Sequence, residues 1–215
     1  MKKNTVIFDL DGTLLDTLQD LADATNYALR KQGMPERTID EVRQFVGNGV
    51  RLLMIRAIPG GEENPLFEET FALFKSYYGE HCNDHTRPYE GIMELLATLR
   101  EKGYAVAIVS NKIDFAVKEL SKLYFQGIVP VAIGEKEGIR RKPAPDTVFE
   151  ALKELGRTKE EAVYVGDSDV DIETAQNAGM PCISVLWGFR DKAFLETHGA
   201  SHYAEKAEEI LKYVE

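Results

Sequence analysis

Five short apolar runs recur along the chain, and they constrain its fold more than any other feature. Each run is apolar throughout instead of alternating with polar residues, which is typical of parallel strands covered by helices on both faces. The runs alternate with helical patterns, so we expect an α/β fold with a doubly wound parallel sheet. The expected strands are TVIFDLD from residue 5, YAVAIVSN from 104, IVPVAIG from 128, AVYVGDS from 162 and PCISVLWG from 181.

Helical segments between these runs carry clear end signals. Glycine commonly follows the last helical residue, and proline is favoured in the first turn. Gly103 ends one expected helix, Gly156 ends a second that begins at Pro145, and Gly179 ends a third.

A long interval separates the first two strands. About 90 residues lie there, whereas a simple crossover needs roughly a dozen. Their pattern is helical: Thr17 is expected to cap a first helix, and Thr38 with Glu41 has the spacing of a capping box before a second. We therefore expect a helical domain over residues 16–84, inserted into an α/β core of residues 1–15 and 85–215. An insertion at this strand end stands over the crevice where α/β sheets bind ligands, and would form a lid.

The amino-acid composition restricts the kinds of partner that this chain is expected to bind. With 36 acidic and 26 basic residues the net charge is −10, so no overall basic field attracts nucleic acid or an anionic membrane surface. The start of the chain lacks the apolar region of a signal peptide, and no run has the roughly 18 apolar residues of a membrane helix. Two cysteines, Cys82 and Cys182, form no disulfide framework, so a cytoplasmic setting is expected. Oligomeric state is left open.

Chemistry-bearing residues follow the expected strands at four places. Because the carboxyl ends of parallel strands meet at one edge of a sheet, these distant residues are expected to share one pocket. Because successive strand residues point to opposite faces, Asp9 and Asp11 are expected to project to the same side. Two like charges held close are unfavourable unless a cation, a proton or a strong hydrogen-bond donor compensates them, and we expect the compensation to be Mg²⁺. The four places are Asp9 to Thr13, Ser110 to Lys112, Lys142, and Asp167 with Asp169 and Asp171.

The order DLDGT, a serine after the second strand, an isolated lysine and GDSDVD resembles the haloacid dehalogenase superfamily of phosphatases. The resemblance covers nearly the whole chain. Within that superfamily, VGNGVRLLMIRAI is similar to the helical cap of the phosphoglycolate phosphatase group, as are NK after Ser110 and WGF after the fifth strand. The resemblance implies a Mg²⁺-dependent phosphomonoesterase that acts through an aspartyl-phosphate on a small phosphorylated metabolite. The leading candidate substrate is 2-phosphoglycolate.

The resemblance also assigns roles to the acidic residues. It implies that Asp9 is the nucleophile, and a carboxylate there could accept a phosphoryl group. Asp11 is expected to protonate the leaving alcohol and to deprotonate water. The expected metal ligands are Asp9, Asp167 and the main-chain carbonyl of Asp11, with Asp171 in a supporting shell or bound through water. Asp169 either joins them or only complements the start of a helix.

The transferring phosphoryl group needs fixed positive partners and hydrogen-bond donors. Lys142 is the expected cation, on a loop stiffened by Pro143 and Pro145. A serine hydroxyl and main-chain amides would complete a phosphate nest. The expected phosphate-binding residues are Gly12, Thr13, Ser110, Asn111 and Lys112.

A substrate carboxylate would need a further cationic or amide partner. The candidates are Asn48, Gly49, Arg51 and Lys112, with Arg190 a weaker one. The glycines of GNG are explained equally well by a turn between two helices.

Several alternatives stay open on the sequence. Other members of the group hydrolyse pyrophosphate or act as sugar-phosphate mutases, and a catalytically silent regulator would share the fold. A receiver-type signalling module is disfavoured because IVPVAIGEKEG has no acceptor aspartate and because such modules lack a helical insertion. HCNDH, with His81, Cys82 and His85, has too few ligands for zinc and is interpreted as a polar hinge.

Overall fold

The computed structural model describes residues 3–214 and divides into two compact units. The α/β unit comprises the chain up to Leu14 and from Pro88 onward, and the helical unit is Leu15–Arg87. Two short strands, β2 (Leu15–Asp16) and β3 (Arg87–Pro88), lie where the chain passes from one unit to the other.

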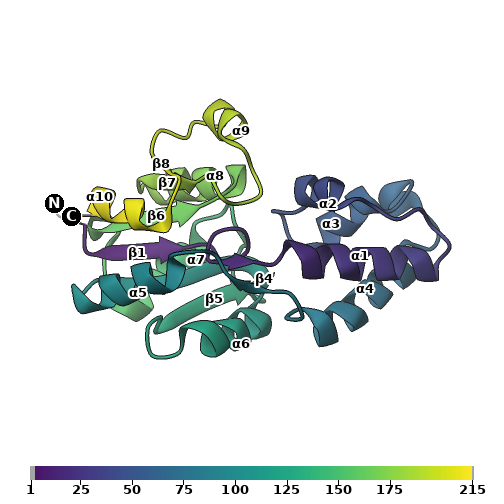
Figure 1. Ribbon diagram of the computed structural model, residues 1–215, viewed down its shortest axis with the longest axis horizontal. Helices are drawn as coiled ribbons and strands as arrows, with labels where there is room; N and C mark the ends of the chain where they lie inside the picture. The colour runs from purple at the N-terminus through teal and green to yellow at the C-terminus, as the bar shows by residue number, and fades with distance from the viewer. Residues whose placement is uncertain (1–2, 215) are drawn as a thin grey trace. The chain divides into compact units, whose positions relative to one another are not determined.

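A six-stranded parallel sheet forms the centre of the α/β unit, in the order β5-β4-β1-β6-β7-β8 (Figure 1). β1 is central, and Ile7 pairs with Ala107 of β4 on one side and with Tyr164 of β6 on the other. This arrangement confirms the predicted doubly wound α/β fold. The strands are β1 (Thr5–Phe8), β4 (Ala105–Ile113), β5 (Val131–Glu135), β6 (Ala162–Gly166), β7 (Cys182–Val185) and β8 (Tyr203–Ala204).

The sixth strand was not expected from the sequence. β8 pairs with β7 through only two residues, and the Ser184 amide donates to the His202 carbonyl at 2.8 Å. A two-residue strand leaves no apolar run, so hydrophobic periodicity cannot detect it.

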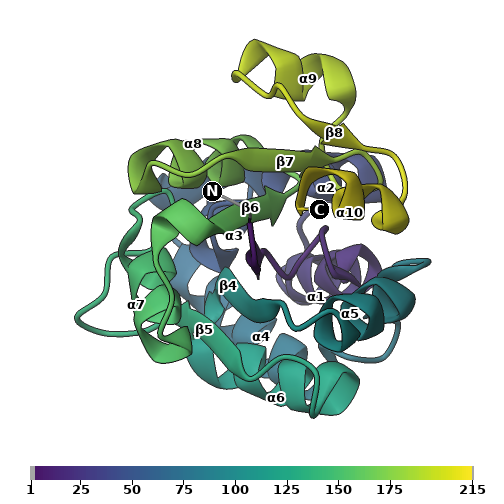
Figure 2. The same cartoon turned by 90° about the vertical axis from the view of Figure 1, so that its left-hand side faces the viewer.

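Helices cover both faces of the sheet: α7 and α8 lie on one face, and α5 and α6 lie on the other (Figure 2). The predicted end signals are confirmed at α7 and α8, where Gly156 and Gly179 adopt left-handed backbone directly after the last helical residue. The helices are α5 (Ile92–Glu101), α6 (Asp114–Phe125), α7 (Asp146–Leu155), α8 (Asp169–Ala178), α9 (Lys192–Thr197) and α10 (Leu211–Val214).

The first strand is shorter than predicted. β1 ends at Phe8, although the Asp9 amide still donates to the Val165 carbonyl at 2.9 Å. Asp9 therefore follows the sheet, while Asp11 lies in the loop beyond it. The prediction that the strand continues through Asp11 is therefore wrong, and strand alternation does not determine the direction of the Asp11 side chain.

The helical unit is built around α1 and α4, which pack along one another (Figure 1). The predicted capping box is confirmed: Thr38 accepts from the Glu41 amide, and the Glu41 side chain accepts from the Thr38 amide. The helices are α1 (Leu18–Lys31), α2 (Ile39–Phe45), α3 (Val50–Ala57) and α4 (Phe67–His81), with a 3₁₀ turn at Gly61–Glu63.

The cap expected from Thr17 is wrong. Thr17 occupies the N-cap position of α1, but its side chain makes no capping hydrogen bond. Its ψ of 4° departs from the extended backbone that lets an N-cap side chain reach the first amides of a helix. The hydroxyl is buried and has no hydrogen-bond partner within residues 3–214.

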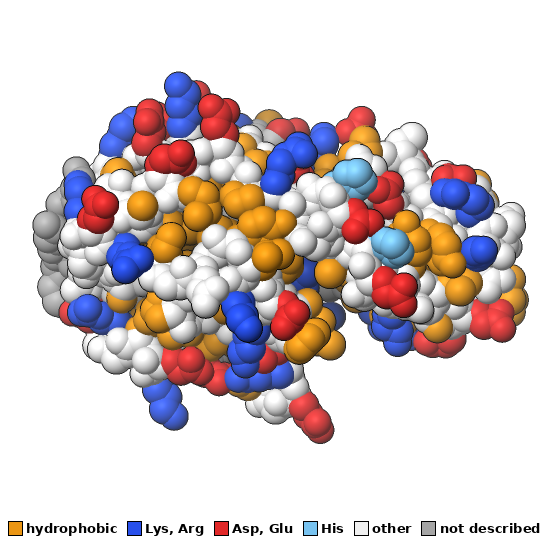
Figure 3. Space-filling view, turned by 60° about the horizontal axis from the view of Figure 1, so that its bottom comes forward, with side chains coloured by type: hydrophobic (Ala, Val, Ile, Leu, Met, Phe, Trp, Pro, Cys, Tyr) orange, Lys and Arg blue, Asp and Glu red, His pale blue; other side chains and the backbone are white. Residues whose placement is uncertain are grey.

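Charged side chains of both signs are interleaved on the face shown in Figure 3. Several charged side chains of the described residues form ion pairs at the surface, such as Arg140 with Asp146 at 2.9 Å. Among the described residues, no helix is both long enough and apolar enough to cross a bilayer.

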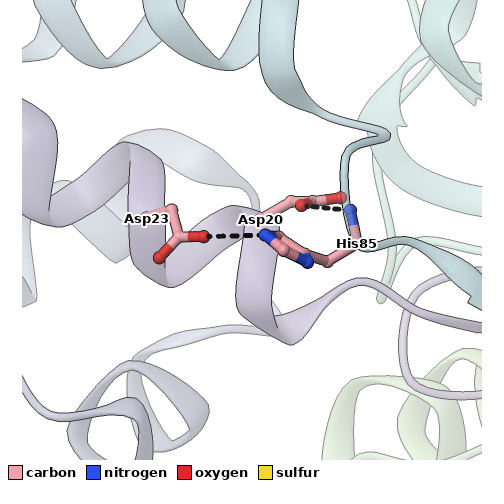
Figure 4. Close-up of side chains that lie close together, drawn as sticks. All are labelled: Asp20, Asp23 and His85. Carbon is pink, nitrogen blue, oxygen red and sulfur yellow. Dashed lines mark hydrogen bonds and ion pairs between the residues drawn. The ribbon is translucent and has the colours of Figure 1, made fainter.

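Asp20 is a buried carboxylate on α1 that holds the segment following α4. Its Oδ1 accepts from the His85 amide at 2.9 Å, and its Oδ2 accepts from the Thr86 amide at 3.0 Å and the Thr86 hydroxyl at 2.7 Å. Asp23, one turn along the same helix, lies 3.6 Å from the His85 ring (Figure 4). Asp20 thus accepts from the amides of His85 and Thr86, and it shares the Thr86 hydroxyl with the Cys82 carbonyl, which lies 3.2 Å away.

We expect Asp20→Ala to lower the free energy of unfolding by about 3 kcal/mol, because it strands buried donors that paired with a carboxylate. Asp23→Ala is the matched control and should stay within about 0.5 kcal/mol of the wild type, because exposed pairs contribute little. Urea unfolding followed by circular dichroism measures both. Equal losses in the two variants would contradict this account.

Candidate active site

Lys142 is the centre of the candidate site. Its side chain is 2% exposed, and its Nζ lies 2.8 Å from Asp9 Oδ1 and 2.8 Å from Asp171 Oδ1. The Tyr164 hydroxyl is a third partner at 3.1 Å. Asp9 follows β1, Lys142 lies in the loop before α7, and Asp171 lies on α8, so the sheet edge gathers these three residues as the sequence predicted. Tyr164 of β6 was not among the predicted residues.

Asp171 is saturated with protein donors. Its Oδ2 accepts from the amides of Asp167 and Ser168 at 3.2 and 3.1 Å and from the Ser168 hydroxyl at 2.6 Å. Its Oδ1 accepts from Lys142 and Tyr164. A carboxylate has about four acceptor positions, so these bonds favour a supporting role for Asp171 over direct metal ligation.

Asp167 is held from two directions. Its Oδ1 accepts from the Thr13 hydroxyl at 3.1 Å, and its Oδ2 accepts from the Phe189 amide at 2.7 Å. Two glycines allow this approach: a Cβ on Gly12, whose φ is +84°, would lie 2.5 Å from Asp167 Oδ2, and one on Gly188 would lie 2.3 Å from Asp167 Cβ. Thr13, predicted to bind phosphate, here orients an acidic residue.

The site carries more negative than positive charge in a buried setting. Burial, together with the neighbouring Asp171 carboxylate, raises the pKa of Asp9 well above its usual value and that of Asp167 to about 7. Burial alone would lower the pKa of Lys142, but the adjacent carboxylates of Asp171 and Asp9 outweigh it and raise that pKa. One ammonium therefore faces three carboxylates.

This arrangement fits a divalent cation. Carboxylate oxygens of Asp9, Asp167 and Asp171 lie within 4.8 Å of one another. Buried carboxylates in excess of their cation are unfavourable unless a proton or metal compensates them. Oxygen-only donors are those that hard cations such as Mg²⁺ prefer.

Asp11 contacts residues of the Ser110 to Lys112 segment, the second of the four places predicted from the sequence. The buried Lys112 Nζ lies 2.9 Å from Asp11 Oδ1. Ser110 is adjacent, because its Oγ accepts from the Lys112 amide at 3.2 Å and lies 3.5 Å from Asp11 Oδ2. Lys112, predicted to meet phosphate or a substrate carboxylate, thus contacts the expected acid/base residue.

Asn111 supports the loop that carries Lys142. Its Nδ2 donates to the Lys142 carbonyl at 3.0 Å, while its Oδ1 is buried and without a hydrogen-bond partner in the described part of the chain. Asp169 lies apart from the acidic group, at the start of α8, with its Oδ1 3.8 Å from Arg190 Nε. That position matches the alternative in which Asp169 complements a helix start.

The candidate substrate residues of the helical unit have local partners there. Arg51 bonds Glu62 and Glu68, and its guanidinium lies 4.9 Å from the centre of the Phe67 ring. Asn48 Oδ1 accepts from Arg56 at 3.2 Å, and Gly49 is the N-cap of α3 with φ +82°. Their contact with substrate stays a prediction.

The two histidines of HCNDH do not come together as ligands for a zinc ion. His81 pairs with Asp84 at 2.8 Å, and His85 is grouped with Asp20 and Asp23 instead of with His81. Both Asp20 oxygens already accept hydrogen bonds from the protein.

Comparisons with known proteins agree with this geometry. Residues 6–185 match the family described as haloacid dehalogenase-like hydrolase. The chain belongs to this family of hydrolases.

Particular relatives are also similar along most of the chain. A phosphoglycolate phosphatase of Aquifex aeolicus (strain VF5) is 35% identical over 86% of this chain and 85% of its own length. One of Mesorhizobium japonicum is 31% identical over 99% and 98% of the two chains. A crystal structure of a candidate phosphoglycolate phosphatase from Lactobacillus delbrueckii subsp. bulgaricus matches with a TM-score of 0.95 and 39% identity, covering 100% of this chain and 99% of the other.

Three features of the site had not been picked out from the sequence. Tyr164 lies in an apolar strand, where its residue type gives no sign of a polar role. The Phe189 amide is a main-chain group with no residue-type signal. Gly188 lies in the WGF segment, whose sequence does not reveal its close approach to Asp167.

We expect the raised pKa of Asp167 to make protein stripped of divalent cations less stable as pH rises from about 4 to about 7. Its folded pKa of about 7 exceeds the ordinary 3.8, so the folded state binds more protons in this window and loses stability as they leave. Asp167→Asn lacks this titration and should flatten the slope.

Thermal unfolding midpoints between pH 4 and 8, measured with chelator, test this expectation. Glu63→Gln removes an exposed carboxyl of the helical unit and should keep the wild-type slope. An unchanged slope in Asp167→Asn would be inconsistent with a buried, proton-binding Asp167.

Proposed function

We propose that the protein is a Mg²⁺-dependent phosphomonoesterase that hydrolyses a small phosphorylated metabolite, and that 2-phosphoglycolate is the leading candidate substrate. The observation that carries the proposal is the buried Lys142 ammonium bonded to Asp9 at 2.8 Å, within a group in which one ammonium faces three carboxylates. A carboxylate nucleophile, a fixed cation and a cation-binding group are the parts that phosphoryl transfer needs. The names of the similar proteins support the choice of substrate.

Asp9 is the nucleophile of the first step. Its carboxylate oxygen attacks phosphorus, the bond from phosphorus to the ester oxygen breaks, and an aspartyl-phosphate forms. Asp11 gives a proton to the leaving alkoxide, which departs as an alcohol. Lys112 and Ser110, which contact Asp11, hold its carboxylate in place.

Water completes the reaction in the second step. Asp11 takes a proton from the water as it attacks phosphorus, and the bond from phosphorus to the Asp9 oxygen breaks. Inorganic phosphate leaves, and the Asp9 carboxylate is restored. The same residue acts first as acid and then as base, so both steps use one proton site.

Charge on the transferring group is stabilised by donors in place before substrate arrives. Lys142 faces the Asp9 oxygen and can bond a phosphoryl oxygen next to it. Ser110 and the amides around Gly12 and Asn111 supply neutral donors. Mg²⁺ held by Asp9, Asp167 and the Asp11 carbonyl would supply positive charge to the phosphoryl oxygens.

The helical unit is proposed to serve as a cap. Asn48, Gly49 and Arg51 would supply donors to the carboxylate of a substrate such as 2-phosphoglycolate. Closure of such a cap would exclude water during the first step.

Asp9→Asn should lower the rate of phosphate release at least about 10³-fold, because an amide cannot form the covalent intermediate. The variant should fold, since it removes one carboxylate from a crowded buried set. Phosphate release from 2-phosphoglycolate with Mg²⁺ and with chelator is the measurement, and Glu63→Gln is the control with wild-type turnover. Surviving turnover would exclude Asp9 as nucleophile.

A substrate panel tests the metabolite separately. We expect 2-phosphoglycolate to give a kcat/KM at least about tenfold above hexose phosphates and pyrophosphate, because a site that pairs the substrate carboxylate rejects analogues without it. Free phosphate is the readout. A preference for pyrophosphate, or conversion between sugar phosphates without phosphate release, would replace the proposed substrate with one of the other activities found in this superfamily.

A further inference from the structure

We propose that the Tyr164 hydroxyl is a positioning group that fixes the Lys142 ammonium at the phosphoryl site. This inference rests on the proposed function, in which Lys142 meets the transferring phosphoryl group. Tyr164 is fully buried in the central strand β6. Its hydroxyl lies 3.1 Å from Lys142 Nζ and 3.0 Å from Asp171 Oδ1.

The hydrogen-bond count of the ammonium supports this role. A lysine ammonium has three donors and no acceptor. The three partners of Lys142 are Asp9, Asp171 and Tyr164, one for each N–H. Asp171 and Tyr164 are bonded to each other, so together they form a rigid pair of anchors. The third donor points to the nucleophile, where a phosphoryl oxygen will lie.

The direction of each hydrogen bond follows from chemistry. An ammonium can only donate, so the Tyr164 oxygen accepts from Lys142 and gives its own proton to Asp171. Burial raises the pKa of Tyr164 well above its usual range, and the nearby Asp171 and Asp9 charges add to that shift. The phenol therefore stays protonated and can bridge the two groups.

The rest of the tyrosine side chain explains why the strand can place its hydroxyl so firmly. The ring belongs to the hydrophobic cluster between the sheet and the α7–α8 layer, which includes Ile7, Val148 and Ala175. The ring centre also lies 5.8 Å from Lys142 Nζ. Tyr164→Phe keeps the ring packing and ring–cation contact, and removes only the bridging hydroxyl.

Kinetics of Tyr164→Phe with Mg²⁺ on p-nitrophenyl phosphate give the first test. We expect kcat to fall about 10- to 100-fold, as for other groups that orient a catalytic residue, while KM changes less than about threefold. Tyr104→Phe is the matched control, because it removes a tyrosine hydroxyl bond to the Val214 carbonyl in the same unit. Tyr104→Phe should keep both constants within about twofold. A wild-type kcat in Tyr164→Phe would overturn the inference.

A double-mutant cycle separates an effect through Lys142 from a general structural effect. If Tyr164 acts through the ammonium, Tyr164→Phe should cost nothing further once Lys142→Met has removed it. A second, undiminished fall in kcat would show that the hydroxyl acts elsewhere and would overturn the inference.

Orthovanadate binding, measured by calorimetry with Mg²⁺, tests the anchor without turnover. Vanadate adopts the five-coordinate geometry of phosphoryl transfer, so its affinity should fall in Tyr164→Phe by about the same factor as kcat. Unchanged affinity would overturn the inference. A wild-type protein that binds vanadate but hydrolyses no phosphate ester would contradict the proposed function and leave this test intact.

Discussion

The buried contact between Lys142 and the carboxylates of Asp9 and Asp171 is the interaction on which the rest of the site depends. Desolvating charged groups costs several kcal/mol per ion unless each is paired and hydrogen-bonded. Asp171 meets that condition through Lys142, Tyr164 and the turn at Ser168. Asp9 and Asp167 meet it only in part, and the remaining negative charge is what makes a divalent cation favourable here.

The parallel sheet makes this concentration of charge possible. Adjacent strands β1 and β6 run in register and end at the same edge, so Asp9 and Asp167 arrive side by side from positions far apart in the chain. Gly12 and Gly188 then let the surrounding loops approach Asp167 without a Cβ clash. The hydrophobic cluster between the sheet and helices α7 and α8 supports the site, and its tyrosine ring carries the hydroxyl that bonds Lys142 at 3.1 Å.

Much of this could be predicted from local patterns. Continuous apolar runs separated by capped helices indicate a parallel α/β sheet, and polar residues after such runs must meet at one edge. Other features could not be predicted. The two-residue strand β8 leaves no periodicity, and Thr17 has the residue type of an N-cap without its backbone geometry. Tyr164 looks like any strand residue until its hydroxyl is seen beside Lys142.

The sequence by itself determined the fold class, the family and the set of acidic and basic residues at the sheet edge. Only the tertiary structure decided how each oxygen and ammonium hydrogen of that set is used. In the folded chain Asp171 accepts a hydrogen bond from Lys142, and Asp11 accepts one from Lys112. The Phe189 amide donates to Asp167. The physical reason is that residue type states how many hydrogen bonds a group can make, whereas its partners depend on where distant loops bring their main chains.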